Sequence, residues 1–301
     1  MTDEISYTRG IIYDRSTIYV TAVIDELEKE DVDHALMLRW SDGKWDHWPI
    51  EGRIVSHCAC PGPNGRLIFA LGEDGQIQVA DGSNLRWESL ASLRTRSGLG
   101  NLTSIRQIGN AVYVVGMQRQ VYKRQLSGDE WIHADLDCVV PAGSSEIASF
   151  EAIAGTSEED IYAAGLYGEI WHFDGMRWTR MDSPTNVKLQ AICCVDPSTT
   201  YIAGARGLVL KGTRLTWNPI LNRSSELTIW SIAKFGNEIY LSTNQGNLLK
   251  IQNDEVSSVK TGLEPLSTFY LHAQDGLLLS TGRKDVAVFD GSEWRRLSYR
   301  R

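Results

Sequence analysis

Residues 150–181, FEAIAGTSEEDIYAAGLYGEIWHFDGMRWTRM, decide the fold class of this 301-residue chain. The stretch opens with an apolar strand, passes a short polar break, and continues with a second strand, Ile-Tyr-Ala-Ala-Gly, at 161–165. A Gly-bearing turn, an alternating strand, an Asp-Gly turn and a strand led by Trp178 follow. Four short strands joined by tight turns predict one four-stranded antiparallel sheet.

The same order recurs along the whole chain. Its second strands are rich in β-branched and aromatic residues, and the others lie at 17–23, 67–72, 111–116, 200–204, 238–246 and 277–282. The closing strands begin at Trp45, Trp87, Trp131, Trp178, Trp217, near Val256, and at Trp294. The spacing of these strands is about 40 residues, which is the period of β-propeller blades.

This repeat predicts an all-β fold, a seven-bladed β-propeller of four-stranded antiparallel blades. Each blade buries both of its faces by stacking on its neighbours, so we expect one domain over residues 1–301. The first unit holds its own innermost strand and the last its own outermost strand, so we expect closure by blade packing without an exchanged strand. The predicted units are 5–50, 51–93, 100–137, 147–183, 187–221, 225–260 and 264–298.

The turn before each closing strand carries a recurring motif. It reads SDGKW at 41–45, FDGMRW at 173–178 and FDGSEW at 289–294, with looser forms at 80–87 and 126–131. Asp-Gly supplies the positive φ that a tight hairpin turn needs. These residues resemble the Asp-box and related Asp-Gly-x-x-Trp repeats of bacterial and phage propellers, although the leading Ser-x-Asp spacing is shortened. The resemblance covers nearly all of the chain and implies its architecture.

Composition and charge exclude several classes of protein. The net charge of -8 argues against a general nucleic-acid binder, which needs a basic surface to displace counterions from phosphates. No apolar run is long enough to cross a bilayer, and the first residues carry acids where a signal peptide would be apolar. The five cysteines are odd in number and irregularly spaced, which favours free thiols in the cytoplasm.

The first unit contains an unusual acidic insertion. Where other units use a compact second-to-third turn, it has VIDELEKEDVDH at 23–34, with six acids and one lysine between Asp25 and Asp33. One interpretation is a solvated loop whose charge keeps it away from its neighbours. The other is an acidic hook for a basic partner.

We expect two long fourth-to-first connections, at 88–101 and 135–149, to lie on the same face as this insertion. The compact second-to-third turns at 72–76, 165–169 and 204–208 should lie there too. Their mixed charge is typical of a surface that binds protein. The residues that we expect to contact a partner are Asp25, Glu26, Glu28, Glu30, Asp31, Asp33, Glu73, Asp74, Arg94, Arg96, Tyr167 and Arg206.

Catalytic, metal-binding and cofactor-binding motifs are not found in the sequence. The pairs Cys58/Cys60 and Cys193/Cys194 have the wrong spacing for a zinc knuckle, so we expect small buried thiols and no metal or cofactor. Asp-box propellers include sialidases, but Glu151, Glu169 and Glu226 fall at unrelated positions of the repeat. We therefore expect no enzymatic activity.

The tryptophans are interpreted mainly as core residues. Six of the ten open closing strands and are expected to act as wedges between blades, and Trp230, on an innermost strand, is expected in the core as well.

The leading hypothesis is a cytoplasmic, monomeric propeller that binds one protein partner and neither nucleic acid nor a membrane. Propellers without catalytic motifs include immunity proteins that neutralise a toxin encoded by a neighbouring gene, and the acidic hook suits a basic toxin domain. The alternatives are an interaction scaffold or assembly factor and, less favoured, a carbohydrate-binding or glycosidase propeller.

Overall fold

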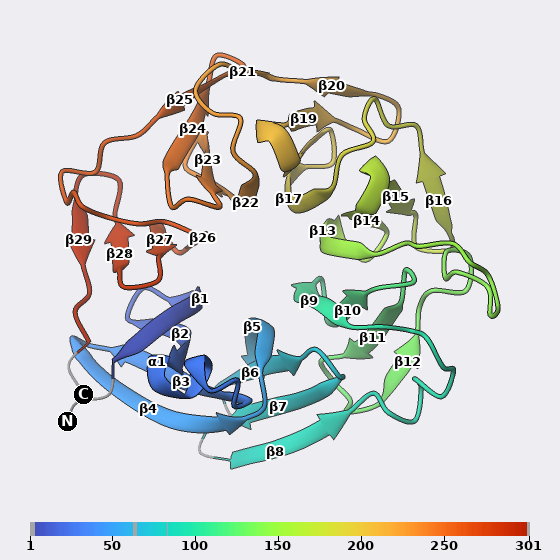
Figure 1. The fold of residues 1–301 in the computed structure, drawn as a ribbon, viewed down its shortest axis with the longest axis horizontal. Coiled ribbons are helices and arrows are strands. Elements are labelled where there is room, and N and C mark those ends of the chain that lie inside the picture. Colours follow the sequence, from blue (N-terminus) through green and yellow to red (C-terminus); the bar gives the residue numbers. More distant parts are fainter. Residues whose placement is uncertain (1–3, 63–64, 83, 300–301) are drawn as a thin grey trace. The chain divides into compact units, whose positions relative to one another are not determined.

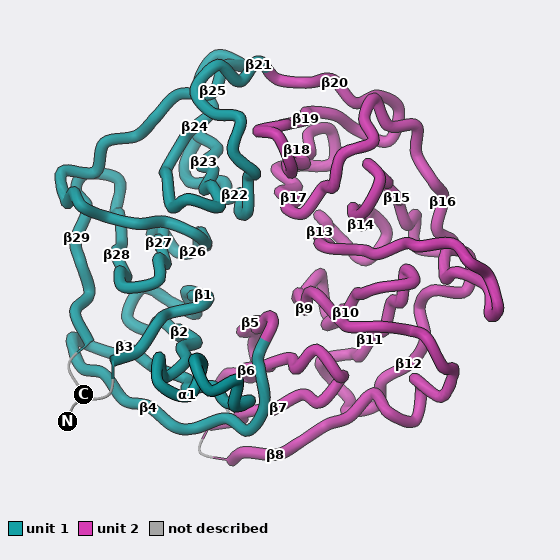
Figure 2. The backbone as a smooth tube through the Cα atoms, in the orientation of Figure 1, with its two compact units in different colours: residues 1–54, 221–301 teal, residues 55–220 magenta. Residues whose placement is uncertain are grey.

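The computed structural model describes residues 4–62, 65–82 and 84–299, which form two compact units (Figures 1 and 2). Unit 1 comprises residues 1–54 and 221–301, and unit 2 comprises residues 55–220. No helix in the described part of the chain is long and apolar enough to span a membrane.

Unit 1 contains three blades, each a sheet with its strands in sequence order. The first is β1 (Ile5–Asp14), β2 (Thr17–Ile24), β3 (His34–Ser41) and β4 (Lys44–Glu51), with helix α1 (Asp25–Lys29) between β2 and β3. The second is β22 (Ile229–Phe235), β23 (Glu238–Thr243), β24 (Leu248–Gln252) and β25 (Glu255–Ser258), and the short β21 (Leu221–Asn222) pairs in parallel with β25. The third is β26 (Tyr270–Gln274), β27 (Leu277–Thr281), β28 (Val286–Phe289) and β29 (Trp294–Arg296).

Unit 2 contains the four remaining blades (Figure 2). They are β5 (Ile54–Gly62), β6 (Gly65–Gly72), β7 (Gln76–Asp81) and β8 (Asn84–Ser89); then β9 (Leu102–Ile108), β10 (Ala111–Gly116), β11 (Val121–Gln125) and β12 (Trp131–His133). The next is β13 (Phe150–Ser157), β14 (Asp160–Gly165), β15 (Ile170–Phe173) and β16 (Trp178–Met181), with the short turn η1 (Leu166–Gly168) after β14. The last is β17 (Leu189–Asp196), β18 (Thr199–Gly204), β19 (Val209–Gly212) and β20 (Trp217–Pro219), with η2 (Ala205–Gly207) after β18.

Seven four-stranded antiparallel blades confirm the predicted fold class. The first blade takes all its strands from residues 5–51 and the last from residues 270–296, so neither contains an exchanged terminal strand. In unit 1, β1 lies against β26, which joins these two blades by packing.

The apolar core lies between neighbouring blades within each unit. In unit 2, Phe150 and Trp178 pack with Ile108 and Tyr113 of the preceding blade, and Trp217 packs edge-on against Tyr162. Burying these large aromatic side chains supplies most of the free energy that holds one blade on the next.

Two tryptophans do not occupy the predicted core positions. Trp178 pairs with Phe173 beside the turn between its two strands. In β8 the spacing after Asp81 is longer, so Trp87 pairs with Gln78, further from the turn, and is exposed. Trp230 is also exposed, since it lies at a bulge in β22 and stacks on Tyr270 of β26.

The acidic insertion differs from the predicted loop in one respect. Residues Asp25–Lys29 form helix α1, and His34 closes the segment because its Nε2 accepts a hydrogen bond from the Ile24 amide, 2.7 Å away. The sequence did not predict this short helix because the segment is mostly charged and has no apolar residues at the 3.6-residue period of a helix.

Candidate protein-binding site

The loops at one end of the strands in unit 2 form a continuous hydrogen-bonded surface. These loops are the second-to-third turns and the fourth-to-first connections. The Leu102 amide donates to the Glu73 carbonyl at 2.9 Å, and the Met117 amide donates to the Asn101 carbonyl at 2.9 Å. Further along, the Ala205 amide donates to the Lys188 carbonyl at 2.9 Å. Main-chain bonds of this kind fix the loops against one another and so shape the surface in advance of any partner.

Arg94 holds three of these loops together. Its Nε donates to Gln120 Oε1 at 3.2 Å, and its two terminal nitrogens donate to the main-chain carbonyls of Asp74 and Gly100. The guanidinium fork is suited to such multiple acceptors because its donors lie in one plane. Arg94 therefore has a structural role in the connection 88–101.

The other predicted contact residues nearby also have partners inside the chain. Arg96 donates to the Val140 carbonyl at 2.6 Å, which links the two long connections. The Glu73 carboxylate accepts from Asn101 Nδ2 at 3.0 Å, and Asp74 accepts from the Gln76 amide at 3.0 Å. Their contact with a partner stays a prediction.

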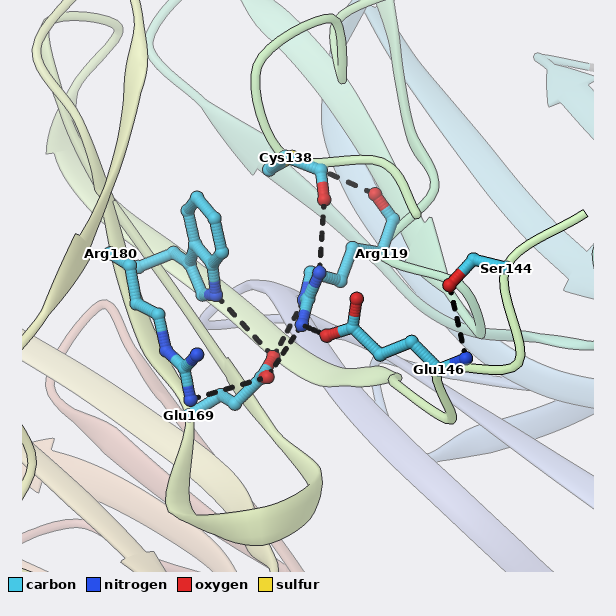
Figure 3. A network of polar contacts seen from close by, with 7 residues as sticks. Arg119, Cys138, Ser144, Glu146, Glu169 and Arg180 are labelled. Atoms are coloured by element: carbon cyan, nitrogen blue, oxygen red, sulfur yellow. Dashed lines mark hydrogen bonds and ion pairs between the residues drawn. The ribbon is translucent and has the colours of Figure 1, made fainter. Parts of the chain in front are cut away.

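A buried ion pair that the sequence did not predict joins two of these loops (Figure 3). Arg119, in the turn between β10 and β11, donates from Nε and Nη2 to the two Glu169 oxygens at 2.7 and 2.6 Å. The side chains are 6% and 4% exposed. Nη2 also contacts Glu146, and Nη1 donates to the Cys138 carbonyl at 3.4 Å.

Glu169 has two further neighbours. Trp171 Nε1 donates to it at 3.4 Å, and Arg180 Nη2 lies 3.6 Å from its Oε1. Burial by itself lowers the pKa of Arg119, but hydrogen bonds to Glu169 and Glu146 outweigh burial and raise that pKa above its ordinary value. Both carboxylate oxygens of Glu169 are therefore occupied by contacts within the chain.

Tyr167 and Arg206 occupy equivalent turns in adjacent blades. Tyr167 has φ 55° and Arg206 φ 58°, and each is followed by a glycine that also has positive φ. The left-handed conformation costs a residue other than glycine about 1–2 kcal/mol. Among the described residues, neither side chain makes a hydrogen bond, ion pair or ring contact, and both are exposed, Tyr167 to 60%.

Ile147 is an exposed apolar residue close to the Tyr167 turn, and the sequence analysis missed it. It is 59% exposed, and two residues further on the Ser149 carbonyl accepts a hydrogen bond from the Leu166 amide at 3.1 Å. On its other side, Glu146 contacts Arg119, which holds Glu169. The segments 146–149 and 166–169 are thus tied together at two points, and Ile147 and Tyr167 lie one on each.

In unit 1, the acidic segment 25–33 is partly neutralised by the chain itself. Asp25 contacts Lys284 and accepts a hydrogen bond from Ser6 Oγ at 2.7 Å. Burial raises the pKa of Asp25, but the bonds from Lys284 and Ser6 outweigh burial and lower the pKa below its ordinary value. The pair fixes the start of α1 on the third blade of unit 1.

Arg53 holds the far end of the same segment. It lies 2.7 Å from Asp31 and 3.1 Å from Asp33, and these two hydrogen bonds raise the pKa of Arg53. Among the described residues, Glu26, Glu28 and Glu30 make no ion pair or hydrogen bond through their side chains. Three of the six predicted acids are therefore available to a partner without breaking an internal contact.

No cluster of three or more His, Cys, Asp or Glu side chains that could hold a metal ion occurs in the described part of the chain. Glu151 lies 2.9 Å from Lys188 in an ion pair. Cys58, Cys60 and Cys138 are buried free thiols, whereas Cys193 and Cys194, which were also expected to be buried, are free thiols that are only partly buried.

The fold and the braced loop surface define a protein-binding β-propeller. No family model matches the chain. Its sequence is 33% identical over 295 residues to immune protein Tsi7 of Pseudomonas aeruginosa, an alignment that covers 96% of this chain and 95% of that protein. The chain belongs to the family of immune protein Tsi7.

Solved structures show the same fold at low sequence identity. The WD40 β-propeller domain of Doa1 has a TM-score of 0.68 at 12% identity and covers 98% of this chain and 93% of that one. YCF48 bound to D1 peptide has a TM-score of 0.67 at 13% identity and covers 96% and 93%.

Proposed function

We propose that this chain is an immunity protein that neutralises one cognate toxin by binding it. The observation that carries the proposal is the 33% identity to immune protein Tsi7, which extends over 96% of the chain. A propeller with a rigid, solvent-facing loop surface supports binding without catalysis, since preformed surfaces lose little conformational entropy on association. The protein needs no cofactor or metal for this role, and it acts as a monomer in the cytoplasm.

The cognate toxin domain is basic. Glu26, Glu28 and Glu30 are unpaired within the described chain and lie in or beside α1, where they present negative charge to an approaching partner. Opposite charge on the partner would speed association and lower the affinity for wrong partners. The scaffold alternative predicts several weak partners, and the glycosidase alternative predicts turnover that is lost when carboxylates are replaced.

The test is co-expression with the toxin domain encoded by the neighbouring gene, together with a binding measurement on the purified pair. The intact chain should protect cells and form one stoichiometric complex. Changing Glu26, Glu28 and Glu30 to Gln should slow association by roughly tenfold at low salt and less at high salt.

The matched control removes three exposed acids from turns at the other end of the strands, with the changes Asp129→Asn, Glu130→Gln and Glu293→Gln. Equal effects of the two triple variants would argue for net charge alone. An intact chain that neither protects nor binds would refute the immunity role.

A further inference from the structure

The turn around Tyr167 has the features of a protein-binding anchor. A large aromatic side chain stands at a left-handed position, φ 55°, where glycine or asparagine is the favoured residue. Tyr167 is 60% exposed and has no hydrogen bond or ring contact with any described residue. The Tyr167 side chain makes no hydrogen bond or ring contact that would offset the cost of this backbone conformation, and strain of this kind is concentrated at functional positions.

We propose that Tyr167 and Ile147 together form the apolar anchor by which this chain holds its cognate toxin, and that the toxin offers an apolar recess bordered by carboxylates. This inference rests on the proposed function and assigns its central contact. Tyrosine is enriched at such anchors because it brings a large rigid surface with few rotatable bonds.

The buried ion pair between Arg119 and Glu169 holds the anchor rigid. Arg119 binds both oxygens of Glu169, which ends the Tyr167 turn, and also contacts Glu146, which precedes Ile147 (Figure 3). The Leu166 amide adds a main-chain bond to Ser149 at 3.1 Å. A buried pair of charges adds little to stability compared with apolar packing, but it fixes a specific geometry. Here that geometry fixes the two neighbouring segments that carry the exposed apolar side chains.

The charges around the anchor favour a carboxylate border on the partner. Glu146 and Glu169 are already bound by Arg119, whereas the Arg180 side chain is 58% exposed and 3.6 Å from Glu169. Arg206, in the equivalent turn of the next blade, is exposed and has no partner among the described residues. The exposed cations Arg180 and Arg206 would therefore meet anions on the toxin, since charges across an interface are complementary.

The experiment separates binding from folding. The purified toxin domain encoded by the neighbouring gene is titrated with the full chain carrying Tyr167→Gly, Tyr167→Asn or Ile147→Ser, and the Tm of each variant is measured alone. Glycine and asparagine accept the left-handed backbone, so both Tyr167 variants should keep or raise the Tm. Each should weaken binding by roughly 30-fold, the change typical of an anchor residue. Asn253→Gly, at another left-handed turn (φ 54°), is the control and should leave the Kd unchanged.

Arg206→Glu tests the carboxylate border and should weaken binding by roughly tenfold. Affinity unchanged or increased by this substitution would overturn the border. Binding within threefold of the intact chain for both Tyr167 variants would overturn the anchor while leaving the immunity role in place. A loss of affinity that follows a lowered Tm would show a structural role and would also overturn it. An intact chain that does not bind the toxin would refute both proposals.

Discussion

Replacing Arg119 by methionine should destabilise unit 2 far more than replacing both Arg119 and Glu169. The single change removes the guanidinium from a carboxylate whose side chain is 4% exposed, and leaves Trp171 at 3.4 Å and Arg180 at 3.6 Å as its remaining neighbours. Breaking a buried ion pair in this way costs about 3–5 kcal/mol. Because the exposed Arg180 can move closer to Glu169, we expect the lower limit, about 3 kcal/mol.

The double variant Arg119→Met/Glu169→Met should recover most of this loss. It removes both charges and fills a similar volume with apolar atoms, a replacement that is often neutral. Glu146 loses a partner but is partly exposed, so water can solvate it. We expect a net change within about 1 kcal/mol of the intact chain.

Urea unfolding followed by tryptophan fluorescence measures these free energies, and the double-mutant cycle gives the coupling between the two residues. For units of about 150–250 residues, 3 kcal/mol lowers the Tm by roughly 6–12 °C. The single variant Glu169→Met should also be destabilised, since it leaves Arg119 with Glu146 and a carbonyl. A cost below about 1 kcal/mol for Arg119→Met, or additive losses in the double variant, would refute the reasoning.

Three further predictions concern a pH dependence, a turn and a thiol. The pKa of Asp25 in the folded chain is below its ordinary value of 3.8. The ion pair with Lys284 therefore adds up to about 1 kcal/mol of stability at pH values above 3.8, and this contribution is lost as the pH falls through the lower pKa of the folded chain. Asp25→Asn should flatten this part of the curve of unfolding free energy against pH, and an unchanged curve would contradict the pairing. Gly168→Ala should cost roughly 2 kcal/mol or more in urea unfolding, because φ is 73° and a new Cβ would lie 2.1 Å from a main-chain oxygen; a neutral result would mean that the turn can rearrange. Burial raises the pKa of Cys60 to about 12, so at pH 8 roughly one thiol in ten thousand is ionised, and Cys60 should react with iodoacetamide only on unfolding; fast labelling of Cys60 in the native chain would show that it is accessible.

The blade architecture could be predicted because its signals are local. The strand at 160–165 and the Asp-Gly turn before Trp178 are written in consecutive residues, and both appear in the structure where the pattern places them. The turns that carry Tyr167 and Arg206 were predicted for the same reason, since each has a glycine immediately after the exposed residue.

The interior of the candidate site could not be predicted in this way. Arg119 and Glu169 are 50 residues apart, and the repeat marks neither, because a charged residue in a turn is ordinarily solvated. Trp87 shows the opposite failure: a shift in register along β8 exposed a residue whose type suggested the core. The sequence also did not show that Arg94, a predicted contact residue, bonds two carbonyls and one side chain of neighbouring loops.

The amino-acid sequence by itself determined the number of blades, the order of their strands and the turns that join them, because hydrogen-bonded hairpins depend on residues close together in the chain. Only the tertiary structure decided which charges are available. Lys284 neutralises Asp25 from 259 residues away, Arg53 holds Asp31, and Arg119 braces the Tyr167 turn. Coulomb energy depends on distance and burial in three dimensions, and neither quantity is contained in the spacing of residues along the chain.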